Sequence, residues 1–158
     1  MKKLLILALL SATTLLASSI EIKDAYVRAT PPGLPNSAAF MTVENKTSHD
    51  IAIISASSKI SKVAELHTHD MKDGVMKMYQ VPKIVVPKNG HTTLQPGGFH
   101  VMLIGLHKPL KEGDTATFTL KFENGETKTI TAPIKTVMGG MKHHNMDHSK
   151  MKHNMNHN

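Results

Sequence analysis

From Glu21 to Ile134 the sequence alternates short β-prone runs with turn residues, a pattern typical of an antiparallel β-sandwich or barrel and not of helices. The breaks between the runs carry Pro, Gly, Asn and Asp, and Glu123-Asn124-Gly125 is a good hairpin signal. Nine short strands with such turns indicate a Greek-key arrangement. We therefore predict an all-β domain with strands at Lys23–Arg28, Ala38–Glu44, Ile51–Ala56, Val63–His69, Val75–Val81, Ile84–Val86, His100–Leu106, Thr115–Phe122 and Thr127–Thr131.

The run Thr115–Phe122 shows how such a strand divides between core and solvent. Its apolar residues Phe118, Leu120 and Phe122 alternate with polar ones, so they share one face of the strand. This face is predicted to belong to the core and not to a functional site.

The N-terminal residues have the features of a secretory signal. Lys2 and Lys3 precede the apolar stretch Leu4–Leu16, and the small residues Ala17-Ser18-Ser19 suit cleavage before Ile20. An apolar stretch of this length is shorter than the roughly 20 residues of a membrane-spanning helix. We predict a signal peptide over residues 1–19, a periplasmic address, and no stable membrane insertion after cleavage. A lipoprotein anchor would need a cysteine, and the chain has none.

Composition narrows the chemistry. The absence of cysteine excludes disulfides, thiolate catalysis, Cys-ligated zinc, iron–sulfur clusters and blue-copper centres. The net charge is +7, but Trp is absent, Tyr occurs twice and Arg28 is the single arginine. Nucleic-acid binding is therefore disfavoured, because backbone binders add arginine forks and stacking aromatics to a basic patch.

The 11 Met and 11 His residues are the unusual feature, and they concentrate at the C-terminus. Residues 138–158 lack aliphatic core formers, so we predict a disordered tail that follows a folded domain at 20–137. A flexible arm of this kind can bind Cu(I) through Met and Cu(II) through neutral His, and the alternative is a solubilising tail. The candidate tail ligands are Met138, Met141, His143, His144, Met146, His148, Met151, His153, Met155 and His157.

Within the body, four residues stand out by their spacing: His67, Met78, His100 and Met102. His100 and Met102 are two positions apart on one predicted strand, so their side chains point the same way, about 6.6 Å apart along it. Two imidazoles and two thioethers form a soft, uncharged donor set that favours Cu(I) over Mg²⁺, Ca²⁺ or zinc. Thioethers also bind without deprotonation and form no disulfides in an oxidising compartment.

Each of these residues, taken alone, also fits a purely structural role. A methionine at an alternating strand position usually packs in the core, and a single histidine in a sheet is usually structural. His69, Met76 and Met71 are possible auxiliary ligands by the same face argument, or else core and rim residues. Three further histidines lie in turn-rich segments and are predicted to be solvated: His49, His91 and His107.

The joint spacing, His followed by ten residues, Met, twenty-one residues and His-x-Met, resembles the periplasmic copper chaperone family called PCu(A)C. The resemblance continues through Glu65–Met71, Gly74–Met78 and Leu94–Leu103, and covers nearly the whole body. It implies a cupredoxin-like Greek-key β-barrel that carries one Cu(I) on His67, Met78, His100 and Met102. It also implies delivery of the ion to the copper A site of cytochrome c oxidase.

More than one function fits a copper-binding chain of this kind. Another copper acceptor or a thiol-bearing copper chaperone could be the partner in place of the copper A domain. A sequestration or resistance protein fits the Met- and His-rich composition equally well. An electron-transfer cupredoxin is excluded by the missing Cys. A copper enzyme is disfavoured because a two-Met set biases the ion toward Cu(I), so we predict that the protein is not an enzyme.

Overall fold

The computed structural model describes residues 19–136, and this part of the chain is all-β, as predicted. The predicted signal peptide and the predicted tail lie outside the described residues. No helix within residues 19–136 is long and apolar enough to span a bilayer. The strands are β1 (Ile20–Arg28), β2 (Asn36–Asn45), β3 (Ile51–Ser58), β4 (Ser61–Lys72), β5 (Val75–Gln80), β6 (Ile84–Val86), β7 (Gly90–Leu94), β8 (His100–Leu106), β9 (Thr115–Phe122) and β10 (Thr127–Lys135).

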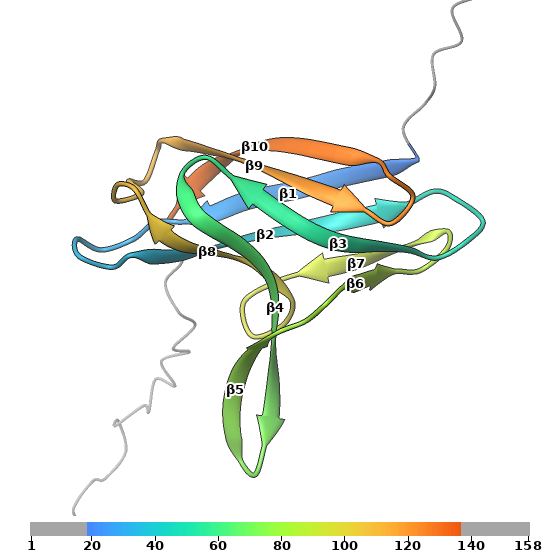
Figure 1. The fold of residues 1–158 in the computed structure, drawn as a ribbon, viewed down its shortest axis with the longest axis horizontal. Coiled ribbons are helices and arrows are strands. Elements are labelled where there is room, and N and C mark those ends of the chain that lie inside the picture. The colour runs from blue at the N-terminus through green and yellow to red at the C-terminus, as the bar shows by residue number, and fades with distance from the viewer. Residues whose placement is uncertain (1–18, 137–158) are drawn as a thin grey trace, which may run out of the picture.

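The strands follow the order β5-β4-β8-β2-β1-β10-β9-β3-β6, and β7 pairs with β2 beside this path. Strands β1 and β10 pair in parallel, whereas the other pairs are antiparallel. Figure 1 shows the strands folded over one another in two layers, with β9 and β10 on one side and the β4–β5 hairpin projecting away from the body.

The core lies between these layers and is built by alternation along the strands. Phe118, Leu120 and Phe122 of β9 are fully buried, which confirms the predicted core face. They belong to one cluster with Val101 and Leu103 of β8. Because β8 turns these alternate residues inward, His100 and Met102 lie on its other face.

The prediction of nine strands was incomplete, because the segment Gly90–Leu94 forms β7. Its backbone pairs with β2 in the register Met41↔Leu94 to Asn45↔Gly90. Only Leu94 is buried, so the segment has a single core residue, and its sequence lacks alternating apolar residues. Three predicted surface histidines are exposed as expected: His49, His91 and His107.

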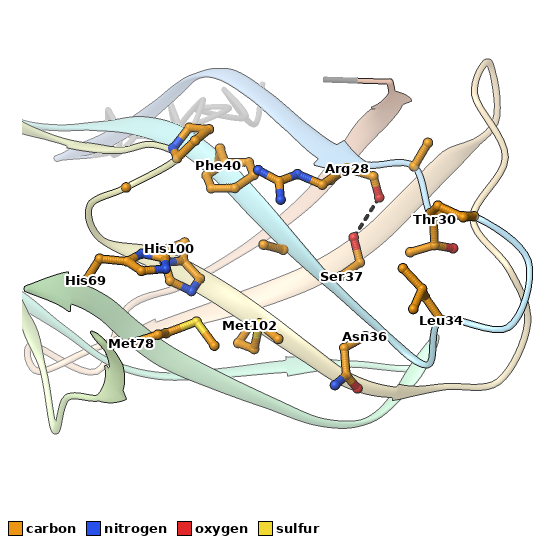
Figure 2. Close-up of a pocket in the computed structure, with 15 residues that line it drawn as sticks. Arg28, Thr30, Leu34, Asn36, Ser37, Phe40, His69, Met78, His100 and Met102 are labelled. Atoms are coloured by element: carbon orange, nitrogen blue, oxygen red, sulfur yellow. Dashed lines mark hydrogen bonds between the residues drawn. The ribbon is translucent and has the colours of Figure 1, made fainter. Parts of the chain in front are cut away.

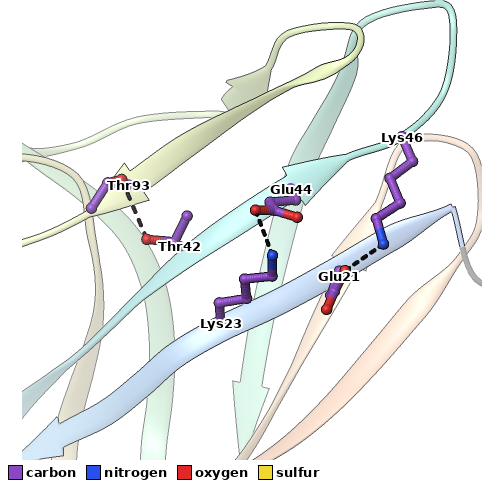
Figure 3. A network of polar contacts seen from close by, with 6 residues as sticks. All are labelled: Glu21, Lys23, Thr42, Glu44, Lys46 and Thr93. Atoms are coloured by element: carbon purple, nitrogen blue, oxygen red, sulfur yellow. Dashed lines mark hydrogen bonds and ion pairs between the residues drawn. The ribbon is translucent and has the colours of Figure 1, made fainter.

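The outer surface of β1, β2 and β7 is polar, and it carries Lys–Glu ion pairs instead of the cluster of His and Met residues expected at a copper site. Figure 3 shows two ion pairs there, Lys23 to Glu44 at 2.8 Å and Lys46 to Glu21. The contact with Lys46 and the charge of Lys23 lower the pKa of the Glu21 carboxyl. Such exposed pairs typically contribute little stability, so this surface is a solvated face of the sheet.

The β4–β5 hairpin is closed by a two-residue turn, Asp73-Gly74. Both residues have positive φ, 54° and 74°, as a type I′ turn requires. The turn sets Lys72 opposite Val75, and the pairs His69↔Met78 and Met71↔Met76 follow from this register. A slip of β5 by one residue would send Met76 and Met78 to the opposite face.

Candidate metal site

The four residues singled out by spacing come from three neighbouring strands, β5, β4 and β8. His67 on β4 is directly opposite His100 on β8, and Met102 is opposite Glu65. Met78 on β5 is opposite His69, two residues closer to the hairpin turn than His67. Strand pairing thus brings residues that are far apart in the sequence onto one face of the sheet.

Three imidazole rings gather where β4 meets β8. The centroid of the His100 ring is 5.8 Å from that of His67 and 5.1 Å from that of His69. His100 is the most deeply placed of the three, with 2% of its surface exposed. Burial lowers the pKa of His100, which favours the neutral ring that can bind a metal.

Hydrogen bonds determine which ring nitrogens are free. The Nδ1 of His100 donates to the Gly98 carbonyl at 3.0 Å, which leaves the lone pair of a neutral ring on Nε2. The Nε2 of His67 is 2.8 Å from Oε2 of Glu65, so this nitrogen donates and Nδ1 is left. A carboxylate beside a ligating histidine commonly fixes its tautomer and orientation.

The buried Nδ1 atoms of His67 and His69 have no hydrogen-bond partner among the described residues. Buried polar atoms normally have partners, so the lone pairs of these two nitrogens are available for a ligand such as a metal ion. Within residues 19–136, however, no three His, Asp or Glu side chains are arranged to hold a metal ion by themselves. The thioethers of Met78 and Met102 line the same cavity as His100, and sulfur ligands fit a soft ion.

The sulfur donors border a cavity of about 280 Å³ lined by His69, Met78, His100 and Met102, among others. Figure 2 shows the rings of His69 and His100 beside each other, with Met78 and Met102 approaching from one side. Met78 is 45% exposed, whereas Met102 is half-buried. The site therefore has a buried imidazole at its base and a thioether at its open rim.

The opposite wall of the cavity carries a positive charge. The guanidinium of Arg28 lies over the Phe40 ring, 5.4 Å from its centroid. The Phe40 ring in turn is 6.2 Å from the His100 ring. Arg28 thus adds to the reasons for a neutral His100, because its charge further lowers the pKa of that ring.

The structure also places the predicted auxiliary residues. His69 lines the cavity and its ring is nearer to the His100 ring than the His67 ring is, a proximity that spacing alone did not rank. Met71 and Met76 form the next pair along the hairpin and are exposed. Sequence reasoning gave Glu65 no role, although it contacts His67; its position two residues before His67 on one strand is the signal that points to it.

Comparisons with known proteins identify the family and the fold of the chain. Residues 20–134 match the family described as "LpqE-like: Putative lipoprotein LpqE-like". A curated relative from Leifsonia xyli subsp. xyli, "Putative lipoprotein Lxx21020", is 32% identical over 124 residues, which cover 78% of this chain and 74% of the relative.

Two solved structures are also similar. The copper-bound PCuAC domain from PmoF2 is 25% identical, with a TM-score of 0.65, and the match covers 76% of this chain and 95% of that domain. The Cu(I) form of DR1885 from Deinococcus radiodurans is 35% identical, with a TM-score of 0.58, over 79% of this chain and 85% of that protein. The predicted cupredoxin-like β-sandwich is confirmed by these likenesses.

Proposed function

The chain belongs to the LpqE-like family of PCuAC domains, and we propose from this that it carries Cu(I) in the periplasm and delivers it to a copper-containing oxidase. The family is one of copper chaperones and not of enzymes. The ion is bound by His67, Met78, His100 and Met102. The supporting observation is that Met78, His100 and Met102 line one cavity, while strand pairing sets His67 opposite His100 beside it.

The arrangement suits a carrier because its ligands differ in accessibility. His100 is buried and anchored to the Gly98 carbonyl, and His67 is held by Glu65. Met78 at the rim is the most exposed of the four ligands. An incoming thiolate can replace this thioether first, because thioethers are neutral ligands that bind more weakly. The imidazoles then release the ion.

The acceptor we propose is the copper A domain of cytochrome c oxidase, with another copper acceptor or a thiol-bearing chaperone as the alternative partner. The relative's name as a lipoprotein supports an envelope location. The chain's lack of cysteine is compatible with a cleaved signal over residues 1–19 and a folded domain at 20–137. The Met- and His-rich composition of residues 138–158 also supports a second candidate function, which is periplasmic copper sequestration.

Replacement of Met102 by Leu tests the site. The change conserves volume and apolarity, so the free energy of unfolding should change by less than about 1.5 kcal/mol. Cu(I) affinity should fall at least about tenfold, as measured anaerobically against a competing chelator with a shortened chain ending at Thr136. Met41→Leu is the matched control, because Met41 is a buried core methionine. Equal affinity in Met102→Leu would remove Met102 from the ligand set.

Transfer separates delivery from sequestration. The loaded protein is mixed with a reduced copper A domain that binds Cu(I) more tightly, and copper on each protein is measured after separation. Movement of the ion within minutes supports delivery. Retention on this protein would favour sequestration.

A further inference from the structure

The face of β4 and β5 that carries Met78 continues toward the hairpin turn with further donors. Successive cross-strand pairs on this face are His67↔Gln80, His69↔Met78 and Met71↔Met76. Directly opposite residues in an antiparallel pair have Cβ atoms about 4.5–5.5 Å apart, within easy reach of two methionine side chains. The Met71–Met76 pair therefore has two thioethers within reach of a single ion, in the next pair on this face beyond His69.

The other face of the hairpin has a different character. It carries Asp70↔Lys77 and Thr68↔Tyr79, which are mainly polar or charged. On the methionine face, Met71 is 61% exposed and Met76 is 56% exposed. Packing against a core therefore cannot account for these two methionines.

His69 lies between the methionine pair and the inner site. It is two residues before Met71 on β4, so both side chains share one face, about 6.6 Å apart along the strand. Its buried Nδ1 has no hydrogen-bond partner among the described residues. Because His69 borders the inner cavity and shares its strand face with Met71, its ring is the nitrogen donor nearest to the methionine pair.

We propose that His69, Met71 and Met76 form a second, outer Cu(I) site on the β4–β5 hairpin, through which copper passes to or from the inner site. Three neutral soft donors match Cu(I) and disfavour hard divalent ions. The proposal rests on the copper-carrier function above and adds a place where the ion is first captured or last held. The exposed position makes the outer site the weaker and faster of the two.

An exposed methionine pair can also serve as an adaptable surface for a protein partner. The two roles separate by substitution, because Met→Leu removes the sulfur and keeps the apolar surface. Val75→Leu is the matched control on the same hairpin, since Val75 is exposed and carries no donor.

The test uses the full chain with ¹³C-methyl methionine and anaerobic additions of Cu(I). Met71→Leu and Met76→Leu identify the two methyl resonances. We expect both resonances to shift together and after those of Met78 and Met102, at higher copper. The double variant Met71→Leu/Met76→Leu should bind one fewer ion than Val75→Leu and should load the inner site at least about threefold more slowly.

Each result has a defined meaning. If Met78 and Met102 respond while Met71 and Met76 stay unchanged with excess Cu(I), the outer site is wrong and the carrier function stands. If Met71 and Met76 respond but the double variant loads the inner site at an unchanged rate, the passage of copper through the outer site is wrong. If no methionine in residues 19–136 responds, the proposed function itself fails. Shifts that appear equally with Zn²⁺ would contradict a soft-ion site.

Discussion

The β9–β10 hairpin and the β4–β5 hairpin are both antiparallel pairs closed by tight turns, yet different forces hold them. Strand β9 buries every second residue, whereas every residue of β5 is exposed. The register of β9–β10 is fixed by Phe118, Leu120 and Phe122 in the core. The register of β5 depends on backbone pairing with β4 and on the Asp73-Gly74 turn.

The difference shows where a carrier of this fold can keep exchangeable ligands. Buried residues of the body contribute stability, and the histidines at the β4–β8 junction border that rigid part. Met78 lies on the hairpin, where its side chain is 45% exposed, and such poorly buried segments open more easily than a core. The buried core thus holds the imidazole of His100 in place, whereas the hairpin, which depends on backbone pairing, leaves the thioether of Met78 loosely held.

The largest effect should come from emptying the core. Phe118→Ala should lower the free energy of unfolding by about 3–5 kcal/mol, because it removes a buried aromatic side chain and leaves a cavity. Tyr79→Ala on the hairpin should cost less than about 1 kcal/mol, because Tyr79 is exposed. Denaturant titration of both variants measures the contrast. Equal losses would show that the hairpin is part of the cooperative core.

The same contrast explains how far the sequence alone could lead. Alternation in Thr115–Phe122 predicted a core strand correctly, because its apolar face must be buried. Strand β7 was missed because Leu94 is its only buried residue, and pairing with β2 instead of side-chain burial holds it in place. Spacing predicted that His100 and Met102 share a face, since they lie on one strand.

The contacts between strands could not be predicted from spacing. The pairing of His67 with His100 depends on the register of β4 against β8, which no local pattern encodes. The proximity of His69 to His100 and the contact between Glu65 and His67 have the same origin. Assignment of all four residues as ligands remains a prediction, which the substitution of Met102 tests.

A substitution in each turn sharpens the comparison at an intermediate magnitude. Gly74→Val places a β-branched residue at φ +74°, which costs about 1–2 kcal/mol although no atom lies within 4 Å of the new Cβ. Because no residue of β5 is buried to hold the register, we expect β5 to slip or fray and Cu(I) affinity to fall as Met78 leaves the site. Amide exchange along β5 and chelator competition measure the two effects.

Gly125→Val is the matched control for that change. Gly125 has φ +86°, open space at its Cβ and a place in the β9–β10 turn. The strain should lower global stability by a similar amount, but the core residues keep the register of β9–β10 and copper affinity stays unchanged. Loss of copper affinity in Gly125→Val with normal folding would contradict the independence of the two hairpins.

The smallest effect should be a pH dependence at the junction of the two regions. Burial is the main cause that lowers the pKa of His100, and the neighbouring His69, His67 and Arg28 charges act in the same direction. In the unfolded chain His100 therefore takes up a proton near pH 6.5, whereas in the folded chain it stays neutral at that pH. The free energy of unfolding should fall as the pH drops from about 6.5 toward the lowered folded pKa, and this loss is absent above that range.

His100→Asn isolates this contribution, because an amide can still donate to the Gly98 carbonyl but does not titrate in this range. Denaturant titration of the metal-free protein between about pH 5 and 7.5 should show a shallower loss of stability in this variant. His91→Asn is the control, since His91 is exposed and should leave the profile unchanged. An identical profile for His100→Asn and the parent would mean that His100 takes up its proton as readily in the folded chain as in the unfolded one, and the junction would then be as open to water as the hairpin.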